Sequence, residues 1–341
     1  MSRVKMRLGA TDGWIKTPDG TSHYIFGFVD ITEVPEDEIF TYRGKGELPS
    51  PLLEVYEGDE VELILTNLGL PQRPDLDDTH TIHWHGFANQ IPLWDGVPEA
   101  SMSVPVGRNF TYFYEPRDPG TYMYHCHFEP VEHIQMGMVG PVIVRPDLEK
   151  QPGYQEQKLA YNHPDTAFDR EYLVFLTDLD TRPHDLVANA QEFDWTDYRP
   201  DYWLLNGRSY PDTLKPDNDT SLPLQPFSGL IEAHPGDRVL LRIINLGFEQ
   251  QCMEILGIVP TVVALDAREL RNPQGQEFYR EEAVISIAAG QTVDAIFVAP
   301  SPGTYPLYNR CFHKQVLAWP SGGMVSEVRV YPRGWPIREG R

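Results

Sequence analysis

Hydrophobic and polar residues alternate over short stretches along most of this chain. The segments 61–65 and 237–242 are examples, and each lies at a Gly-Asp pair of the kind that forms turns. The 31 prolines and 27 glycines recur between such stretches, which favours many short strands joined by tight turns. The sequence shows no heptads and no run near the roughly 18 apolar residues that a membrane helix needs. The pattern therefore predicts an all-β protein without a membrane span.

The same pattern occurs twice. The stretch 52–69 is closely copied at 231–247, with Asn67 and Asn245 at equivalent positions 178 residues apart, and Gly120-Thr121-Tyr122 returns as Gly303-Thr304-Tyr305. A chain of 341 residues also suggests two domains on length alone. We expect two tandem Greek-key β-sandwich or barrel domains, at 1–150 and 166–341, joined by a polar linker at 151–165. A long acidic and aromatic insertion, 180–223, interrupts the second copy.

Charge and cysteine content narrow the classes of function. The formal net charge of −22 opposes binding to nucleic acid or to an anionic membrane surface and favours neutral or cationic partners. Three cysteines are too few for a disulfide framework. The first residues carry positive charges without an apolar stretch, so no secretory signal is visible, and either the protein is not exported or a signal has been removed.

Six of the 11 histidines fall close to one another, in His80-x-x-His83-x-His85 and in His125-Cys126-His127 with His133 just beyond. Because side chains alternate faces along a strand, His83 and His85 point to the same side of their strand. His125 and His127 likewise share one side of theirs, and Cys126 points to the opposite side. The spacing therefore predicts two opposite sites. One gathers four imidazoles, and the other gathers Cys126 with the residues His80, His133 and Met138.

The second set of donors has the chemistry of a copper site for electron transfer. Two imidazoles and a thiolate with a distant thioether select copper, because thiolate and thioether stabilise Cu(I) while imidazoles accept Cu(II). Zinc is the other metal considered, but a Met ligand suits it poorly. We expect His80, Cys126, His133 and Met138 to form a type 1 copper centre, with His80 or His133 presenting an edge to the electron donor.

These motifs resemble the copper motifs of the multicopper oxidases, in particular of the two-domain, laccase-like group with type 1 copper in the first cupredoxin-like domain. The resemblance covers nearly the whole chain, but its diagnostic motifs lie in residues 80–138. It implies that His83 binds type 2 copper and that the remaining motif histidines bind a type 3 pair, namely His85, His125 and His127. It further implies that Asp95, in Trp94-Asp95-Gly96-Val97-Pro98, assists proton delivery behind the type 2 copper, although Asp95 equally fits a turn.

The second copy departs from this family pattern. The resemblance implies a three-copper cluster with eight histidines, four of them from the second domain, yet the repeat places Glu254 and Leu256 where His83 and His85 stand. Likewise, Tyr308, Asn309 and Arg310 stand where the His125-Cys126-His127 motif does. Leucine cannot bind copper and the arginine guanidinium stays charged, so a standard cluster is not expected.

Several readings of the second copy remain open. It is a structural half that lost its metals, or it supplies unorthodox ligands from the set Glu254, His234 and His313, or a separate subunit completes the site. We take Glu254 as a candidate catalytic residue. Cys252 and Cys311 fall on the two strands that would line this site, either as a disulfide or as free thiols.

The leading hypothesis is a copper-dependent oxidoreductase that takes electrons from an electron-rich organic compound or a reduced metal ion. The alternative is a non-catalytic electron-transfer or copper-binding protein, and a nitrite reductase is ranked below both. The resemblance also implies an extracytoplasmic, periplasmic or secreted protein. A homotrimer is expected, because a site shared between the first domain of one chain and the second domain of the next requires a ring.

Overall fold

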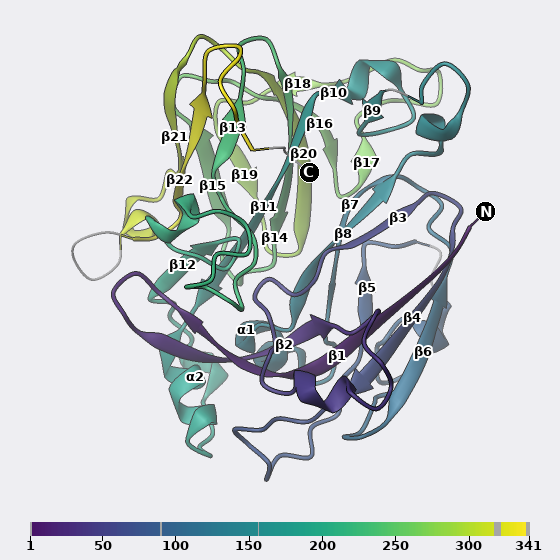
Figure 1. Cartoon of the computed structure of the whole chain (residues 1–341), viewed down its shortest axis with the longest axis vertical. Helices are drawn as coiled ribbons and strands as arrows, with labels where there is room; N and C mark the ends of the chain where they lie inside the picture. The colour runs from purple at the N-terminus through teal and green to yellow at the C-terminus, as the bar shows by residue number, and fades with distance from the viewer. Residues whose placement is uncertain (1, 89–90, 156, 317–321, 339–341) are drawn as a thin grey trace.

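The computed structural model describes residues 2–88, 91–155, 157–316 and 322–338. Two β-sandwiches built from consecutive halves of the chain lie against each other, with the first-half strands in the lower part of Figure 1 and the second-half strands in the upper part. The prediction of an all-β fold is confirmed, since the described residues contain two α-helices, both short. No described helix has the length and apolar character needed to cross a membrane.

The first half contains two four-stranded sheets among the described residues. The outer sheet has the order β2-β1-β4-β6, and the inner sheet has the order β3-β8-β7-β5. Their bounds are β1 Arg3–Lys16, β2 Ser22–Asp30, β4 Glu60–Asn67, β6 Asn109–Tyr114, β3 Leu53–Tyr56, β8 Val139–Arg145, β7 Gly120–His125 and β5 His83–His85. The alternation in β4 places its apolar residues in a core between the sheets, which also contains Cys126 and Met138.

The second half repeats this plan with more strands. A seven-stranded sheet has the order β12-β11-β14-β20-β16-β17, with β18 also paired to β16, and a five-stranded sheet has the order β13-β22-β21-β15-β19. Their bounds are β11 Arg170–Leu179, β12 Tyr202–Leu205, β14 Arg238–Asn245, β16 Thr261–Leu265, β17 Arg268–Glu269, β18 Arg280–Glu281, β20 Gln291–Val298, β13 Ile231–Ala233, β15 Gln251–Ile255, β19 Ile285–Ile287, β21 Gly303–Asn309 and β22 Val325–Val330.

The internal repeat is visible in matching hydrogen bonds. The side-chain amide of Asn67 donates to the carbonyl oxygen of Val104 at 2.9 Å, and that of Asn245 donates to the carbonyl oxygen of Ile287 at 3.1 Å. In both copies the asparagine side-chain oxygen also accepts a hydrogen bond from the glycine two residues later. Each asparagine therefore closes the same loop in its own half.

A buried network of charges joins the halves. Arg242, in β14, binds Glu171 at 2.7 Å and Asp294 at 3.2 Å, and all three side chains are almost completely buried. From the first half, Arg145 also binds Glu171, at 2.8 Å, and the Thr121 hydroxyl donates to Asp294. The segment between the halves forms the short pair β9 (Lys158–Leu159) and β10 (Ala167–Phe168).

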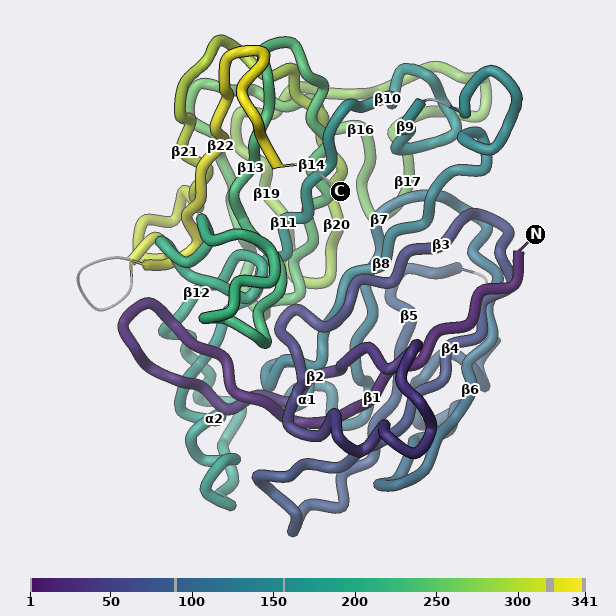
Figure 2. The backbone as a smooth tube through the Cα atoms, in the orientation of Figure 1, coloured from purple at the N-terminus to yellow at the C-terminus, as the bar shows by residue number. Residues whose placement is uncertain are grey.

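The insertion at 180–223 packs on the first half. It contains the helix α2 (Thr181–Ala188), which lies beside β2 in the tube view (Figure 2). His184 of this helix hydrogen-bonds the carbonyl oxygen of Tyr24 at 2.5 Å, and Arg73 donates to the carbonyl oxygen of Val187. A segment of the second copy therefore closes over the first sandwich, near the other helix, α1 (Pro130–Met136).

Candidate metal centre

The first candidate site, here called the Cys126 site, consists of His80, Cys126, His133 and Met138. Cys126 follows β7 directly, and its backbone N–H donates to the carbonyl oxygen of Met138 at 3.1 Å. His133 lies in α1, which ends at Gly137 with a left-handed φ of 116° that favours glycine. His80 is held by two backbone hydrogen bonds to Val104. Three separate elements therefore deliver these side chains to one end of the sandwich.

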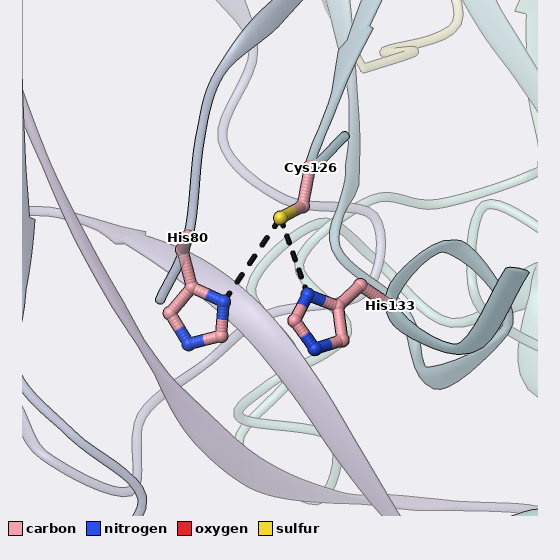
Figure 3. Close-up of side chains that lie close together, drawn as sticks. All are labelled: His80, Cys126 and His133. Atoms are coloured by element: carbon pink, nitrogen blue, oxygen red, sulfur yellow. Dashed lines mark hydrogen bonds between the residues drawn. The ribbon is translucent and has the colours of Figure 1, made fainter. Parts of the chain in front are cut away.

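Figure 3 shows the two imidazole rings turned toward the sulfur atom. The Nδ1 atom of His133 lies 3.3 Å from Cys126 Sγ, and the Nδ1 atom of His80 lies 3.9 Å from it. All three donor atoms fall within 4.8 Å of one another. The backbone N–H of Thr81 points at the same sulfur from 3.4 Å, which orients it. Met138 belongs to the same buried cluster as Cys126.

The site is closed to solvent, and this corrects the expectation that His80 or His133 presents an edge to a donor. His80, Cys126, His133 and Met138 each have 0% exposure. The Nε2 atom of His133 faces the Asp78 carboxylate at 3.8 Å, and Asp78 itself is partly exposed. Asp78 therefore lies between the buried imidazole and the surface. This residue was not singled out in the sequence, although it is only two positions before His80.

Electrostatic effects of opposite sign act on the two histidines of this pocket. Burial lowers the pKa of His80 well below its usual range, and the neighbouring His133 lowers it further. Burial acts in the same direction on His133, but the Cys126 thiolate and the Asp78 carboxylate outweigh it and raise the pKa of His133 to about 10. The negative groups beside His133 attract positive charge, and the pocket offers a sulfur and two ring nitrogens, an arrangement that fits a metal ion.

The second candidate site, here called the four-histidine site, consists of His83, His85, His125 and His127. The register of β5 and β7 sets His83 opposite His125, and the donor atoms of His83, His85 and His125 lie within 4.8 Å of one another. The ring of His127 lies 5.1 Å from that of His83 and 5.8 Å from that of His125, between centroids. The alternation along the strands thus separates this site from the Cys126 site.

Hydrogen bonds fix the orientation of two of these rings, those of His83 and His125. The Nδ1 of His83 donates to the carbonyl oxygen of Asp95 at 2.7 Å, and the Asp95 carboxylate lies 3.4 Å away. The Nδ1 of His125 donates to the carbonyl oxygen of Cys126 at 2.9 Å. The Nε2 atom of His125 lies 3.3 Å from the Nδ1 atom of His85, which brings two ring nitrogens of the site together. Burial lowers the pKa of His125 to about 3, which keeps its ring neutral and its lone pair available.

The second half contributes backbone to the edge of the four-histidine site. A Cβ atom on Gly290 would lie 3.3 Å from the His85 ring, and the φ of Gly290 is positive, at 75°. Only glycine allows this close approach without strain. Gly290 carries no donor side chain and was not singled out in the sequence.

The counterparts in the second half form a different cluster. Glu254 lies opposite Tyr308, as His83 lies opposite His125. The Glu254 carboxylate accepts hydrogen bonds from Tyr308 at 2.9 Å and from Arg310 at 2.6 Å, and the Arg310 guanidinium holds the pKa of that carboxyl below its usual value. Among the described residues, its hydrogen-bond and ion-pair partners are Tyr308 and Arg310 and not a histidine. Leu256 is more than half exposed.

The two histidine candidates of the second half contact tryptophans, and its two cysteines are unpaired. His313 packs against Trp203, and His234 binds the carbonyl oxygen of Trp335. Cys252 and Cys311 are both free thiols, and the sulfur of Cys252 lies 3.5 Å from the hydroxyl of Ser286. Of the two alternatives for these cysteines, the structure has the unpaired form.

Comparison with known proteins agrees with this arrangement. Laccase-15 of Oryza sativa subsp. japonica is 30% identical over 295 residues, covering 82% of this chain and 42% of the laccase. A copper resistance protein A homolog of Pseudomonas syringae pv. tomato is 28% identical over 301 residues, covering 77% of this chain and 44% of that protein. The chain thus spans less than half the length of these relatives.

Solved structures share the fold over nearly all of the chain. A blue copper oxidase from Nitrosomonas europaea aligns with a TM-score of 0.74 at 24% identity, covering 97% of this chain and 86% of that chain. A copper nitrite reductase from the same organism aligns with a TM-score of 0.69 at 20% identity, covering 100% and 98%. At such identities the likeness shows the two-sandwich cupredoxin fold and not the activity.

Family models match on both sides of the linker. Residues 29–149 match one model described as multicopper oxidase, and residues 170–332 match another with the same description. The matches together span most of the chain, and the first contains every residue of the two candidate sites. On this ground, and with the donor geometry in view, the chain belongs to the multicopper oxidase family.

Proposed function

We propose that this chain is an oxidoreductase of the multicopper oxidase type, with type 1 copper at the Cys126 site and further copper at the four-histidine site. The convergence of two imidazole nitrogens on the Cys126 sulfur, in a fully buried pocket with Met138, carries the proposal. This donor set suits copper better than zinc, magnesium or calcium. Copper held there would accept and release single electrons.

The covalent structure of the chain connects the two sites. Cys126 lies between His125 and His127, so a few bonds of one backbone segment separate the sulfur from the imidazoles of the opposite face. The hydrogen bond from His125 Nδ1 to the Cys126 carbonyl oxygen shortens this path further. We assign Asp95 as the residue that orients His83 and offers a carboxylate for proton movement beside it.

A non-catalytic electron carrier is the second candidate function. The ion pair between Glu254 and Arg310 supports it, because it stands where the family pattern places copper-binding histidines. An arginine there repels a metal ion. A catalytic role of Glu254 would then depend on meeting the four-histidine site of a second chain.

We further propose that the chain acts extracytoplasmically as a homotrimer, with domains at 1–150 and 166–341 and a linker at 151–165. The two repeat-related strands support a ring, since β7 is buried along its whole length whereas most of β21 is exposed or partly exposed. A head-to-tail contact with the next chain would cover β21 as the second half covers β7. Light scattering of the purified protein measures the mass of the assembly, and a mass three times that of one chain would support the trimer.

Copper content and the visible spectrum test the function. We expect an intense thiolate-to-copper band that Cys126→Ser abolishes, while Cys252→Ser, a matched control at one of the two other cysteines, leaves it intact. One copper ion per chain without oxygen uptake would favour the carrier, and three or four with oxygen uptake would favour the oxidase. Survival of the band in Cys126→Ser would disprove the type 1 assignment.

A further inference from the structure

Two backbone hydrogen bonds at the end of β21 and in the segment after it have counterparts in the loop of the Cys126 site. The N–H of Asn309 donates to the carbonyl oxygen of Met324 at 3.1 Å, as that of Cys126 donates to Met138 at 3.1 Å. The N–H of Met324 then donates to the carbonyl oxygen of Lys314 at 2.8 Å, as that of Met138 donates to His133 at 2.9 Å. The two loops therefore share these two hydrogen bonds, although they differ in length.

This match assigns a counterpart to each donor of the Cys126 site. Asn309 replaces the cysteine, Met324 retains the methionine, and Lys314 replaces His133. The strand register that pairs Glu254 with Tyr308 places Gln251, three residues earlier, at the position of His80. All four counterparts are buried, with exposures between 0% and 4%.

The four side chains touch one another in a continuous series. The amide nitrogen of Asn309 lies 3.3 Å from the sulfur of Met324 and donates to the side-chain oxygen of Gln251 at 2.7 Å. That oxygen also accepts from the ammonium of Lys314 at 3.1 Å. The pocket is thus closed around one positive charge.

Three oxygens surround this ammonium. Besides Gln251, the carbonyl oxygen of Gln250 lies at 2.8 Å and the carboxylate of Glu249 at 2.9 Å from Lys314 Nζ. A buried ammonium is tolerated only when such partners replace its water. The ammonium of Lys314 has three N–H donors, and each has an oxygen partner here.

We infer that the second half keeps the framework of a second Cys126-type metal site, in which the ammonium of Lys314 takes the place of the metal ion. The inference rests on the proposal that the Cys126 site binds copper. A built-in cation supplies the positive charge that the buried oxygens need and repels a metal ion. The second half is therefore stable without copper, and redox chemistry is confined to the first half.

Restoring the donors tests this inference in the full-length chain. We expect the triple variant Gln251→His, Asn309→Cys, Lys314→His to bind one more copper ion per chain than the wild type and to gain a second thiolate-to-copper band. Placing the triple change on a Cys126→Ser background isolates the new site, because the band of the first half is then absent. A folded variant on this background that gains neither copper nor a band would overturn the inference.

The wild-type protein separates failure of the inference from failure of the proposed function. If the wild type binds copper with a thiolate band and the folded triple variant adds none, only the inference fails. If the wild type binds no copper at Cys126, the proposed function fails first.

A single substitution covers the case in which the triple variant does not fold. Lys314→Met removes the buried ammonium from all three of its oxygen partners, so we expect Tm to fall by roughly 5 °C or more beyond the effect of Lys215→Met. Lys215 pairs with Asp212 but is partly exposed, which makes it a matched control. Equal losses in the two variants would overturn the role of Lys314 as an internal cation.

Discussion

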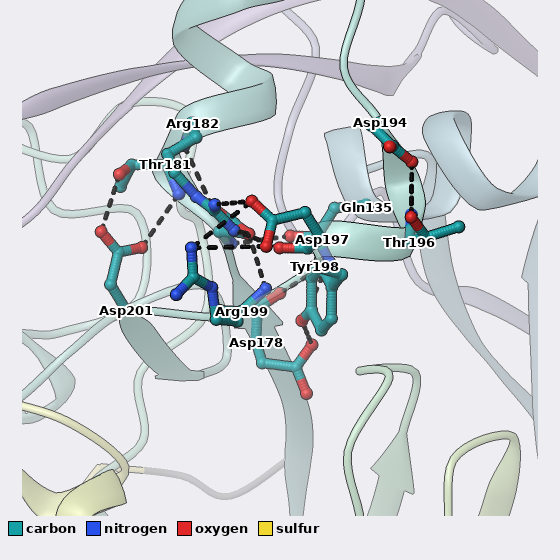
Figure 4. Close-up of polar contacts among 11 residues, drawn as sticks. Gln135, Asp178, Thr181, Arg182, Asp194, Thr196, Asp197, Tyr198, Arg199 and Asp201 are labelled. Carbon is teal, nitrogen blue, oxygen red and sulfur yellow. Dashed lines mark hydrogen bonds and ion pairs between the residues drawn. The ribbon is translucent and has the colours of Figure 1, made fainter.

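The side-chain oxygen of Gln135 accepts a hydrogen bond from the backbone N–H of Asp180 at 2.9 Å. Gln135 lies between His133 and Met138 in the chain, and its amide nitrogen also donates to the carbonyl oxygen of Asp178 at 3.2 Å (Figure 4). One buried glutamine therefore ties the metal-binding loop of the first half to the start of the insertion. The contact joins α1, the helix that carries His133, to a segment of the second copy.

Replacing Gln135 with alanine should loosen this loop. The substitution removes two buried hydrogen bonds and leaves backbone groups unpaired, which we expect to lower the free energy of unfolding by about 2 kcal/mol. Urea denaturation measures the loss, and a broadened or shifted thiolate-to-copper band would report the loosened ligands. Gln191→Ala changes an exposed glutamine of the same insertion and should leave both measurements unchanged.

Asp95→Ala should reduce turnover without removing the blue colour. Partners that orient metal-bound histidines contribute about 10- to 100-fold to activity or metal affinity. Because the backbone carbonyl oxygen of Asp95 still accepts from His83 after the substitution, we expect a loss of about 10-fold in oxygen uptake. Steady-state oxygen consumption measures it, and an unchanged rate would contradict the role of the carboxylate.

The separation of the two sites could be predicted from the sequence because strand geometry is local. Two-residue alternation along β5 and β7 fixes which side of the strand each histidine faces, and the structure gathers the donors in two groups accordingly. The internal repeat likewise located Glu254 and Tyr308 at the positions of His83 and His125, and the structure pairs the two residues in the same way. These relationships need only the backbone period and the register between neighbouring strands.

The burial of His133 could not be predicted in this way. It depends on contacts between residues far apart in the chain, such as the packing of the His133 ring against Phe26 and the approach of Asp78 to its Nε2 atom. The substituted pocket of the second half was also missed. Gln251 and Lys314 differ chemically from the histidines they replace, and the two loops differ in length, so only the hydrogen bonds of the folded backbone reveal the correspondence.

Arg242→Met should destabilise the contact between the halves strongly. The side chain is fully buried, and its removal leaves Asp294 without a cationic partner among the described residues, while Glu171 keeps only Arg145. Breaking a buried ion pair from one side costs about 3–5 kcal/mol. Denaturation in urea should show this loss. Arg199→Met, at an exposed ion pair with Asp197, is the control and should change stability little.

Glu47 should make stability depend on pH near neutrality. Burial, assisted by the nearby Asp30 carboxylate, raises the pKa of Glu47 from its usual value near 4.5 to about 7. The unfolded chain therefore releases this proton at a lower pH than the folded chain does. The stability that the protonated group contributes is complete below about pH 4.5 and is lost as the pH rises to about 7.

Glu47→Gln removes the ionisation and keeps the shape of the side chain. We expect the variant to have a higher Tm than the wild type at pH 8, where the folded wild type holds a buried carboxylate, and little difference at pH 5, where that carboxyl is protonated. Differential scanning calorimetry at the two pH values measures the contrast. Glu33→Gln, an exposed glutamate beyond the end of β2, should shift Tm equally at both. If Glu47→Gln behaved in the same way, ionisation of Glu47 would have no part in the pH dependence.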